Sequence, residues 1–252
     1  MSYAPTDYDF GDSSNYAFAE TITCANDEAR TMFVEAYGHM LNYNHEQAIA
    51  CFMKCTESDP NCAMAWWGIA YCLSSSYNWS AGLGPGYDAI QQAISVKDGC
   101  SELEQDLIMA LSTRHTKEAR DNANPAALNM GNSPELNQAF ADAMAPLYEK
   151  YSGNLDVTAI YVEALMNLNP WTLWNKDAST GEITPVDDST LMLIKIMEDA
   201  FESSDEAKVH PALCHLYCHA LELSPFPERA LPAADVLLSL IHISEPTRHG
   251  LI

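Results

Sequence analysis

Residues 44–71 have the sequence NHEQAIACFMKCTESDPNCAMAWWGIAY and predict two consecutive helices. Asn44 can cap the first helix, and Phe52 lies on its apolar face. Asp59 and Pro60 end that helix, because the residue before a proline is pushed out of the helical region. A helix rich in alanine and tryptophan follows directly. The stretch therefore predicts a pair of helices joined by a short turn.

The same helical pattern continues along the chain from Asn26. Most predicted helices begin at a side chain that can accept a hydrogen bond from the first turn. These capping residues are Asn26, Ser101 (in a capping box with Glu104), Ser133 and Asn154. No segment alternates apolar and polar residues for long, so we expect no strands, and residues 117–132 and 169–186 are expected to be loops.

Small and large residues recur where the helices of a tetratricopeptide repeat need them. Small residues are required where two helices touch, bulky ones beside them, and a proline at the end of the second helix. The matching positions are Ala36, Ala48 and Cys55 (small), Phe52 (bulky), Pro60 (terminal), and Trp66 and Ala70, which open the next unit. A general helical array remains the alternative, because small residues at helical spacing occur in many bundles.

Three segments together resemble one family of bacterial and algal tetratricopeptide-repeat proteins of poorly defined function. They are YNHEQAIACFMKCTESDPNCAMAWWGIAY, VEALMNLNPWTLW and HLYCHALELSPFPERALPAADVL, within Asp27–Leu237. The resemblance implies an all-α fold, in which antiparallel helix pairs form a TPR-like array (an α-solenoid). In that family a histidine-rich segment follows ALPAAD, and here a different sequence stands in its place.

Three regions are expected along the chain. Residues 1–22 are expected to be a disordered acidic lead-in, and residues 23–237 the repeat domain. Within residues 238–252, the string LSLIHISEPTR resembles a translated sequencing-library adapter, so we interpret this tail as non-native and the repeat domain as truncated.

Charge excludes several classes of partner. The 252 residues include 12 Lys and Arg against 35 Asp and Glu, a formal net charge of −23. Nucleic-acid binding and a polybasic membrane anchor both need clustered basic residues, so neither is expected. No targeting segment and no run of ~20 apolar residues is visible, so a cytoplasmic protein without a membrane segment is expected. The 8 cysteines form no CxxC pair and are expected to be reduced thiols.

The segment HPALCHLYCHALE is the densest group of potential metal ligands. His215 and His219 are four residues apart and share one helical face, and His210 lies just before the helix. Such a pair can bind one transition metal ion, for example zinc, if further ligands come from elsewhere. No HExxH motif is present, and packed histidines beside buried thiols are the alternative interpretation.

Aromatic loops are the other candidate site. Trp79, Trp171 and Trp174 lie in predicted loops and could line a groove, although core packing is the alternative. Asn44 and His45 at a helix start are further candidate binding residues.

Together these features predict a non-catalytic scaffold that binds a protein or peptide on a concave, acidic face. The charge favours a basic or amphipathic partner, and no catalytic residue and no cofactor are expected, since no nucleophile or phosphate-binding motif is present. The alternative is a protein, either an enzyme or a binding protein, that binds a metal or small ligand through the histidine-rich helix and the tryptophan loops.

Overall fold

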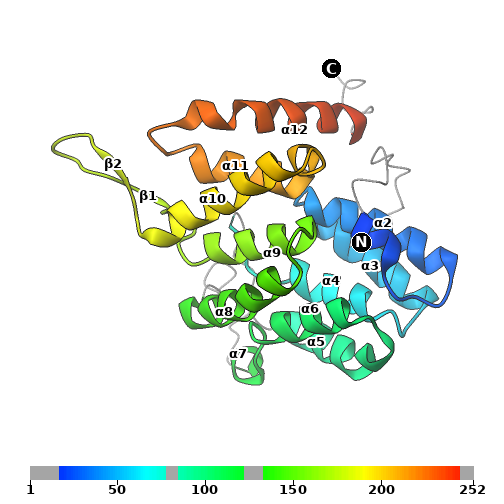
Figure 1. Cartoon of the computed structure of the whole chain (residues 1–252). Helices are drawn as coiled ribbons and strands as arrows, with labels where there is room; N and C mark the ends of the chain where they lie inside the picture. The colour runs from blue at the N-terminus through cyan, green and yellow to red at the C-terminus, as the bar shows by residue number, and fades with distance from the viewer. Residues whose placement is uncertain (1–16, 78–84, 122–132, 245–252) are drawn as a thin grey trace, which may run out of the picture.

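Helices form almost all of the regular structure in the computed structural model, which describes residues 17–77, 85–121 and 133–244 (Figure 1). The α-helices are α1 (Ala17–Thr21), α2 (Asp27–Leu41), α3 (His45–Ser58), α4 (Ala63–Cys72), α5 (Pro85–Val96), α6 (Glu102–Ser112), α7 (Lys117–Asp121), α8 (Pro134–Lys150), α9 (Leu155–Met166), α10 (Asp188–Ser203), α11 (Pro211–Leu221) and α12 (Leu231–Ser244). Short 3-10 helices are η2 (Lys97–Gly99), η3 (Ala207–Val209) and η4 (Pro227–Ala230). The predicted all-α class is confirmed.

The predicted helix starts are confirmed at four positions. The side chains of Asn26, Ser101, Ser133 and Asn154 each accept a hydrogen bond from the first turn of the following helix. Glu104 completes the capping box with Ser101 and also accepts hydrogen bonds from the amide and hydroxyl of Thr23, each at 2.7 Å. This buried carboxylate therefore joins α6 to the segment before α2.

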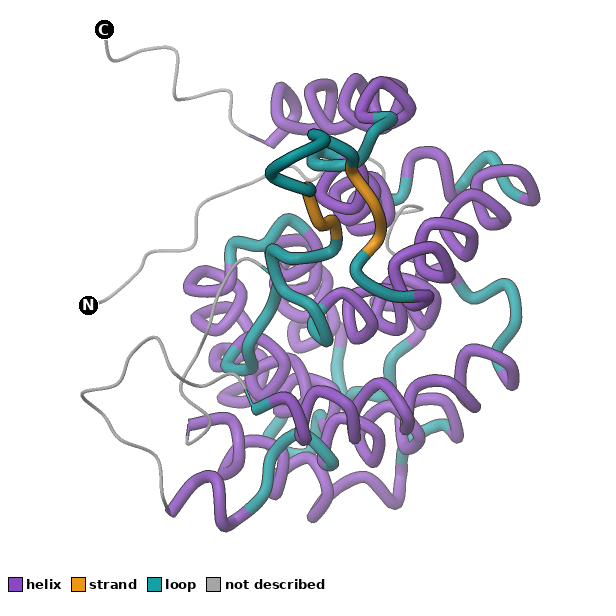
Figure 2. The backbone as a smooth tube through the Cα atoms, turned by 90° about the vertical axis from the view of Figure 1, so that its left-hand side faces the viewer, coloured by secondary structure: helices purple, strands orange, loops and turns teal. Residues whose placement is uncertain are grey.

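Consecutive helices lie side by side through most of the chain. Contacts run from α2 to α3, α4 and α5, then from α8 to α9 and α10, and finally from α11 to α12 (Figure 1). Figure 2 shows the packed helices from a second side, with the two short strands beside them. Helix α9 lies near the centre of this arrangement (Figure 1). Such pairing of neighbours follows from the short turns between the helices.

The two halves of the array also meet each other at α9. The Tyr37 hydroxyl on α2 donates to Asp156 on α9 at 2.5 Å, and the Tyr71 hydroxyl on α4 donates to Glu163 on α9. His210, just before α11, lies 3.6 Å from the same Asp156 carboxylate. These contacts define a buried polar seam, which joins α2 and α4 to α9 and α11.

The contact between α3 and α4 depends on a glycine. A Cβ atom added at Gly68 would lie 2.4 Å from the Phe52 ring, which is completely buried. The Phe52 ring therefore packs directly against α4, and Gly68 gives it the space.

The expectation of no strands is wrong for residues 169–186. A small antiparallel hairpin forms there from β1 (Trp174–Lys176) and β2 (Ile183–Pro185) and extends away from the helices (Figure 1). Its turn is held by Asp177, whose carboxylate accepts three hydrogen bonds from Ser179 and Thr180. Three residues per strand are too few to give a recognisable alternating pattern.

The lead-in predicted for residues 1–22 extends too far, because α1 lies within it. Phe18 and Ile22 are buried, and the Phe18 ring lies 5.6 Å from that of Tyr37. The Arg30 guanidinium holds the end of α1 by donating to backbone carbonyls at 2.7 and 2.9 Å. Tertiary contacts form this helix, and its five residues are too short to show a helical period.

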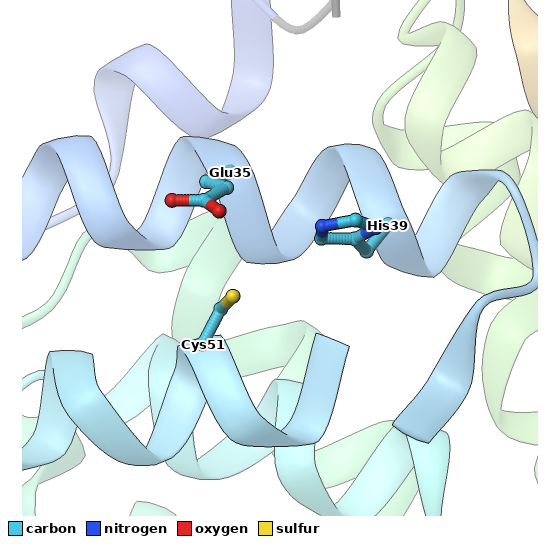
Figure 3. A group of neighbouring side chains, drawn as sticks. All are labelled: Glu35, His39 and Cys51. Atoms are coloured by element: carbon cyan, nitrogen blue, oxygen red, sulfur yellow. The ribbon is translucent and has the colours of Figure 1, made fainter. Parts of the chain in front are cut away.

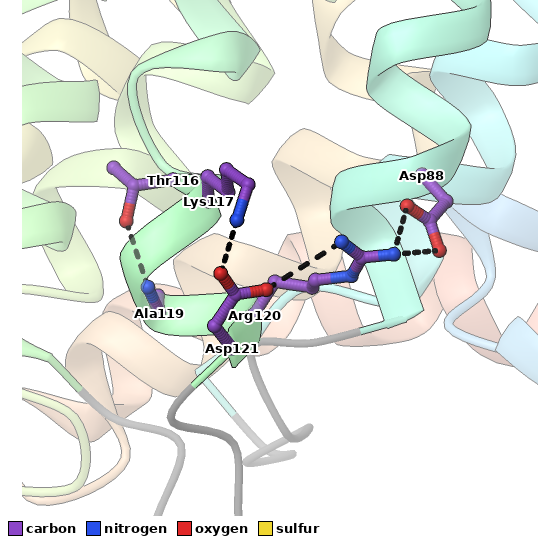
Figure 4. A network of polar contacts seen from close by, with 6 residues as sticks. All are labelled: Asp88, Thr116, Lys117, Ala119, Arg120 and Asp121. Carbon is purple, nitrogen blue, oxygen red and sulfur yellow. Dashed lines mark hydrogen bonds and ion pairs between the residues drawn. The ribbon is translucent and has the colours of Figure 1, made fainter.

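The loop predicted at 117–132 begins with a short helix, α7, whose start is capped by the Thr116 hydroxyl (Figure 4). Arg120 forms ion pairs with Asp88 on α5 at 3.1 Å and with Asp121 at 3.5 Å. Exposed pairs of this kind contribute little to stability because the solvent screens them, so they orient α7 more than they stabilise the fold.

Three further findings bear on the sequence predictions. Helix α12 continues through Ser244 into the stretch interpreted as a non-native tail. No helix in the described ranges has the length and apolarity needed to cross a membrane. All 8 cysteines are free thiols.

The variant Gly68→Ala should destabilise the protein, although alanine is the better helix former. We expect a loss of about 1–3 kcal/mol in unfolding free energy, because the new methyl group must displace the Phe52 ring. The matched control is Gly99→Ala, where a Cβ atom meets nothing within 4 Å. Urea unfolding of both variants measures this, and equal stabilities would contradict the close approach.

Candidate functional site

Tyr43 occupies a position where glycine is the usual residue. It follows the C-cap of α2 with a positive φ of 58°, and its amide donates to Met40 O at 3.0 Å. The amide of Asn44 donates to His39 O at 2.9 Å, which completes a Schellman motif. A side chain in this left-handed conformation costs about 1–2 kcal/mol, so the contacts of the Tyr43 ring must offset that cost.

Trp171 is strained in the same way. Its φ is 61°, it follows Pro170, and the amide of Thr172 donates to Asn169 O at 3.1 Å. These features fit a type II β-turn, in which the residue after proline is normally glycine. Tyr43 and Trp171 are the residues other than glycine that have positive φ in the described part of the chain.

Both strained aromatic residues belong to one group of rings. Tyr43 stacks on His215 at a centroid distance of 4.3 Å, and His215 lies 4.7 Å from His219. His219 lies 5.3 Å from Tyr77 and 5.9 Å from Trp171, and Tyr77 stacks on Trp171 at 5.3 Å. We call these five residues the aromatic–histidine cluster. It joins the turn after α2, the segment after α4, the turn after α9, and α11.

A buried carboxylate lies beneath this cluster. Glu163 accepts hydrogen bonds from the hydroxyls of Tyr43 and Tyr71. Burial raises the pKa of Glu163, and the hydroxyls and the positive charge of Arg114 oppose that rise. Arg114 is itself buried and donates two hydrogen bonds to Asn137. Tyr43 is thus held by two contacts: its hydroxyl donates to the Glu163 carboxylate, and its ring stacks on His215.

The two cluster histidines differ in their surroundings. Burial, and then the neighbouring His219, lower the pKa of His215 to about 4, so this imidazole is neutral at pH 7. His215 Nε2 is buried and has no hydrogen-bond partner among the described residues. His219 Nδ1 lies 2.8 Å from the carboxylate of Glu222, which is largely exposed. The cluster therefore runs from a buried neutral ring to an acidic group at the surface.

The structure brings together several residues that the sequence predicted. Trp171, His215 and His219 are members of the cluster, and the His45 ring lies 5.7 Å from Tyr43 at its edge. The Trp174 indole donates to Ala220 O at 2.7 Å, which fixes the hairpin against α11. Trp79 lies outside the described residues.

Two predicted site residues have other surroundings. His210 is the N-cap of α11, where its Nδ1 accepts from Leu213 N at 3.4 Å, and its other nitrogen faces Asp156. Asn44 is at the N-cap of α3 but makes no side-chain cap bond, and its amide lies 3.5 Å from His39 Nδ1. The predicted trio of His210, His215 and His219 does not form one three-ligand group.

Sequence reasoning missed a different group of metal-ligand side chains. Among the described residues, Glu35, His39 and Cys51 place one potential ligand atom each within 4.8 Å of the others (Figure 3). Glu35 and His39 are four residues apart on α2, a spacing visible in the sequence. Cys51 comes from α3, so the complete group depends on how the two helices pack.

A cavity among the described residues lies elsewhere. An open groove of about 480 Å³ lies between α10, α11 and α12, and Phe201, Tyr217 and Val236 contribute to its lining. None of the residues predicted from the sequence lines it, and it borders the helix that continues into the tail.

No protein-family model, no curated protein and no solved structure matches this chain.

Acid should weaken the fold through His215. An unfolded histidine has a pKa near 6.5, and the folded value of about 4 lies below it, so the stabilising effect of the neutral ring is lost as pH falls from about 6.5 through 4. Between pH 7 and 4, we expect the His215→Gln variant to lose about 1–3 kcal/mol less unfolding free energy than the unaltered protein does. Urea unfolding between pH 7 and 4 measures it.

Burial also lowers the pKa values of His39 and His45 to about 4. Replacing either residue by Gln is a matched comparison and should reduce the loss of unfolding free energy in acid similarly. A His215→Gln curve parallel to that of the unaltered protein would contradict the burial of a neutral ring.

Proposed function

We propose that this protein is a non-catalytic, tetratricopeptide-like helical scaffold, and that it binds a partner protein or peptide at the surface around Trp171. The observation that carries the proposal is that Trp171 is exposed to solvent and yet held in one fixed position. Its side chain is 53% exposed, yet its backbone is held in a left-handed conformation and its ring is stacked on Tyr77.

An exposed tryptophan held in place by its neighbours is suited to recognition. Tryptophan is enriched among the residues that contribute most to binding interfaces, and a fixed ring loses little conformational entropy when a partner binds. Backbone strain of this kind concentrates at functional positions. If Trp171 served the core instead, burial would be expected in place of an exposed fraction above one half.

Charge determines the kind of partner. Glu222 is bonded to His219, which contacts Trp171, so a carboxylate adjoins the exposed indole. Exposed Leu223 follows Glu222 directly. With a net charge of −23, the surface suits a segment that carries Lys or Arg beside an apolar residue. The cation could lie over the indole face and also pair with the carboxylate.

The buried carboxylates of the polar seam are not available to a partner. Asp156 and Glu163 lie between the helices, are buried, and accept hydrogen bonds from tyrosine hydroxyls. They act within the fold, and the acidic groups available to a partner are those at the surface, such as Glu222.

A second candidate, a small-ligand site in the same cluster, is favoured by the buried and unpartnered Nε2 of His215. A ligand that donates a hydrogen bond there would raise the melting temperature. In that case His215→Phe would abolish the rise and Trp171→Gly would preserve it.

Trp171→Gly should separate recognition from stability. Glycine relieves the strain at positive φ while the ring stacking is lost, so we expect the unfolding free energy to stay within about 1 kcal/mol. Binding of a fluorescein-labelled amphipathic peptide of Lys and Leu, followed by anisotropy, should weaken at least about tenfold, or about 1.4 kcal/mol.

Met53→Ala is the matched control, because Met53 is equally exposed at 53% and lies on α3. It should bind the peptide as the unaltered protein does, since neither substitution changes the charge. Equal affinity of the Trp171→Gly variant, or its destabilisation by several kcal/mol, would contradict the proposal.

A further inference from the structure

We propose that Glu35, His39 and Cys51 form a binding site for a divalent transition metal ion, zinc by preference, between α2 and α3. The site goes beyond the proposed function, because it lies outside the aromatic–histidine cluster and needs no partner protein.

The geometry supplies three ligands from two helices. The candidate ligand atoms all lie within 4.8 Å of one another. Glu35 and His39 are one helical turn apart on α2, and Cys51 on the facing side of α3 lies between them (Figure 3). A tetrahedral ion with bonds of about 2.0–2.3 Å holds its ligands about 3.3–3.8 Å apart, so small side-chain movements are sufficient.

The chemical types of the donors favour zinc. A thiolate, an imidazole and a carboxylate are all common zinc ligands, and three protein ligands leave a fourth position for water or a substrate. Magnesium and calcium prefer oxygen ligands alone. His39 and Cys51 are buried, and Glu35 is partly exposed.

Asn44 provides a second, independent observation. An asparagine at an N-cap normally bonds to the first turn of its helix, but the Asn44 side chain makes no such bond. Its amide lies 3.5 Å from His39 Nδ1. Histidines that bind a metal commonly have the second ring nitrogen hydrogen-bonded, and Asn44 is in position for that role: its Nδ2 faces Nδ1, and a half-turn of the amide would place its carbonyl oxygen there to accept from Nδ1–H.

Protonation states determine when the ion binds. Burial lowers the pKa of His39 to about 4, so the ring is neutral and available above that pH. Burial, and then the nearby Glu35 carboxylate, raise the pKa of Cys51 to about 11, which Lys54 and Gln47 partly oppose. The Cys51 thiol must therefore release its proton to the solvent when the ion binds.

Cobalt substitution tests the site directly. We expect the 252-residue protein to bind about one equivalent of Co²⁺ or Zn²⁺, and the cobalt form to show the intense near-ultraviolet charge-transfer band of a thiolate ligand. Cys51→Ser should abolish that band, and His39→Gln should weaken zinc binding at least about tenfold.

Cys55→Ser is the matched control. Cys55 is buried one turn further along α3, and its thiol donates to Ala29 O at 3.2 Å, so it should keep the metal and the band. Circular dichroism shows whether each variant is folded, and the cobalt spectrum of the unaltered protein tests the proposal even if Cys51→Ser fails to fold.

Two results would overturn the proposal. One is the absence of stoichiometric zinc and of a charge-transfer band in the unaltered protein. The other is metal binding that Cys51→Ser retains and His215→Ala abolishes, which would assign the ion to the aromatic–histidine cluster. The first result leaves peptide binding at Trp171 untouched, whereas the second would place the ion beside Trp171, and anisotropy with and without zinc then tells whether the peptide still binds there.

Discussion

The burial of two carboxylates on α9 is the constraint on which the rest of the structure depends. A carboxylate removed from water costs several kcal/mol unless hydrogen-bond donors or cations compensate it. Asp156 accepts a hydrogen bond from the Tyr37 hydroxyl, and Glu163 accepts hydrogen bonds from the hydroxyls of Tyr43 and Tyr71. These donors come from α2, α4 and the turn between α2 and α3, so satisfying the carboxylates requires the early helices to meet α9. Helix packing alone, being apolar, would specify that meeting much less strictly.

The same constraint connects the interior to the surface. Tyr43 must leave α2 in a left-handed conformation to reach Glu163, and in that position its ring stacks on His215. His215 contacts His219, and His219 contacts the second strained aromatic residue, Trp171. Two positions that would normally be glycine thus hold aromatic rings, at about 1–2 kcal/mol each. The contacts of the two aromatic rings must offset this backbone strain. We therefore propose that the surface beside these rings is the binding site.

Local features of the fold could be predicted from the sequence, and long-range ones could not. Caps such as Ser101 with Glu104 depend on residues a few positions apart, and they were confirmed. The group formed by His215 and His219 was visible because both lie on one helix. The positive φ of Trp171 was not visible, since a turn after proline normally shows itself through glycine. The role of Glu163 depends on Tyr71, 92 positions away, and on Tyr43, which is farther still, and no spacing rule contains such distant partners.

Native-state hydrogen exchange is the measurement that tests most directly whether the buried polar seam holds the early and late helices together. Replacing Glu163 by Ala removes the acceptor that Tyr43 and Tyr71 share. If the carboxylate joins the two halves of the array, backbone amides of α2, α4 and α11 should lose protection together with those of α9. A loss of protection confined to α9 would contradict this account, because the early and late helices would then be held together without the carboxylate.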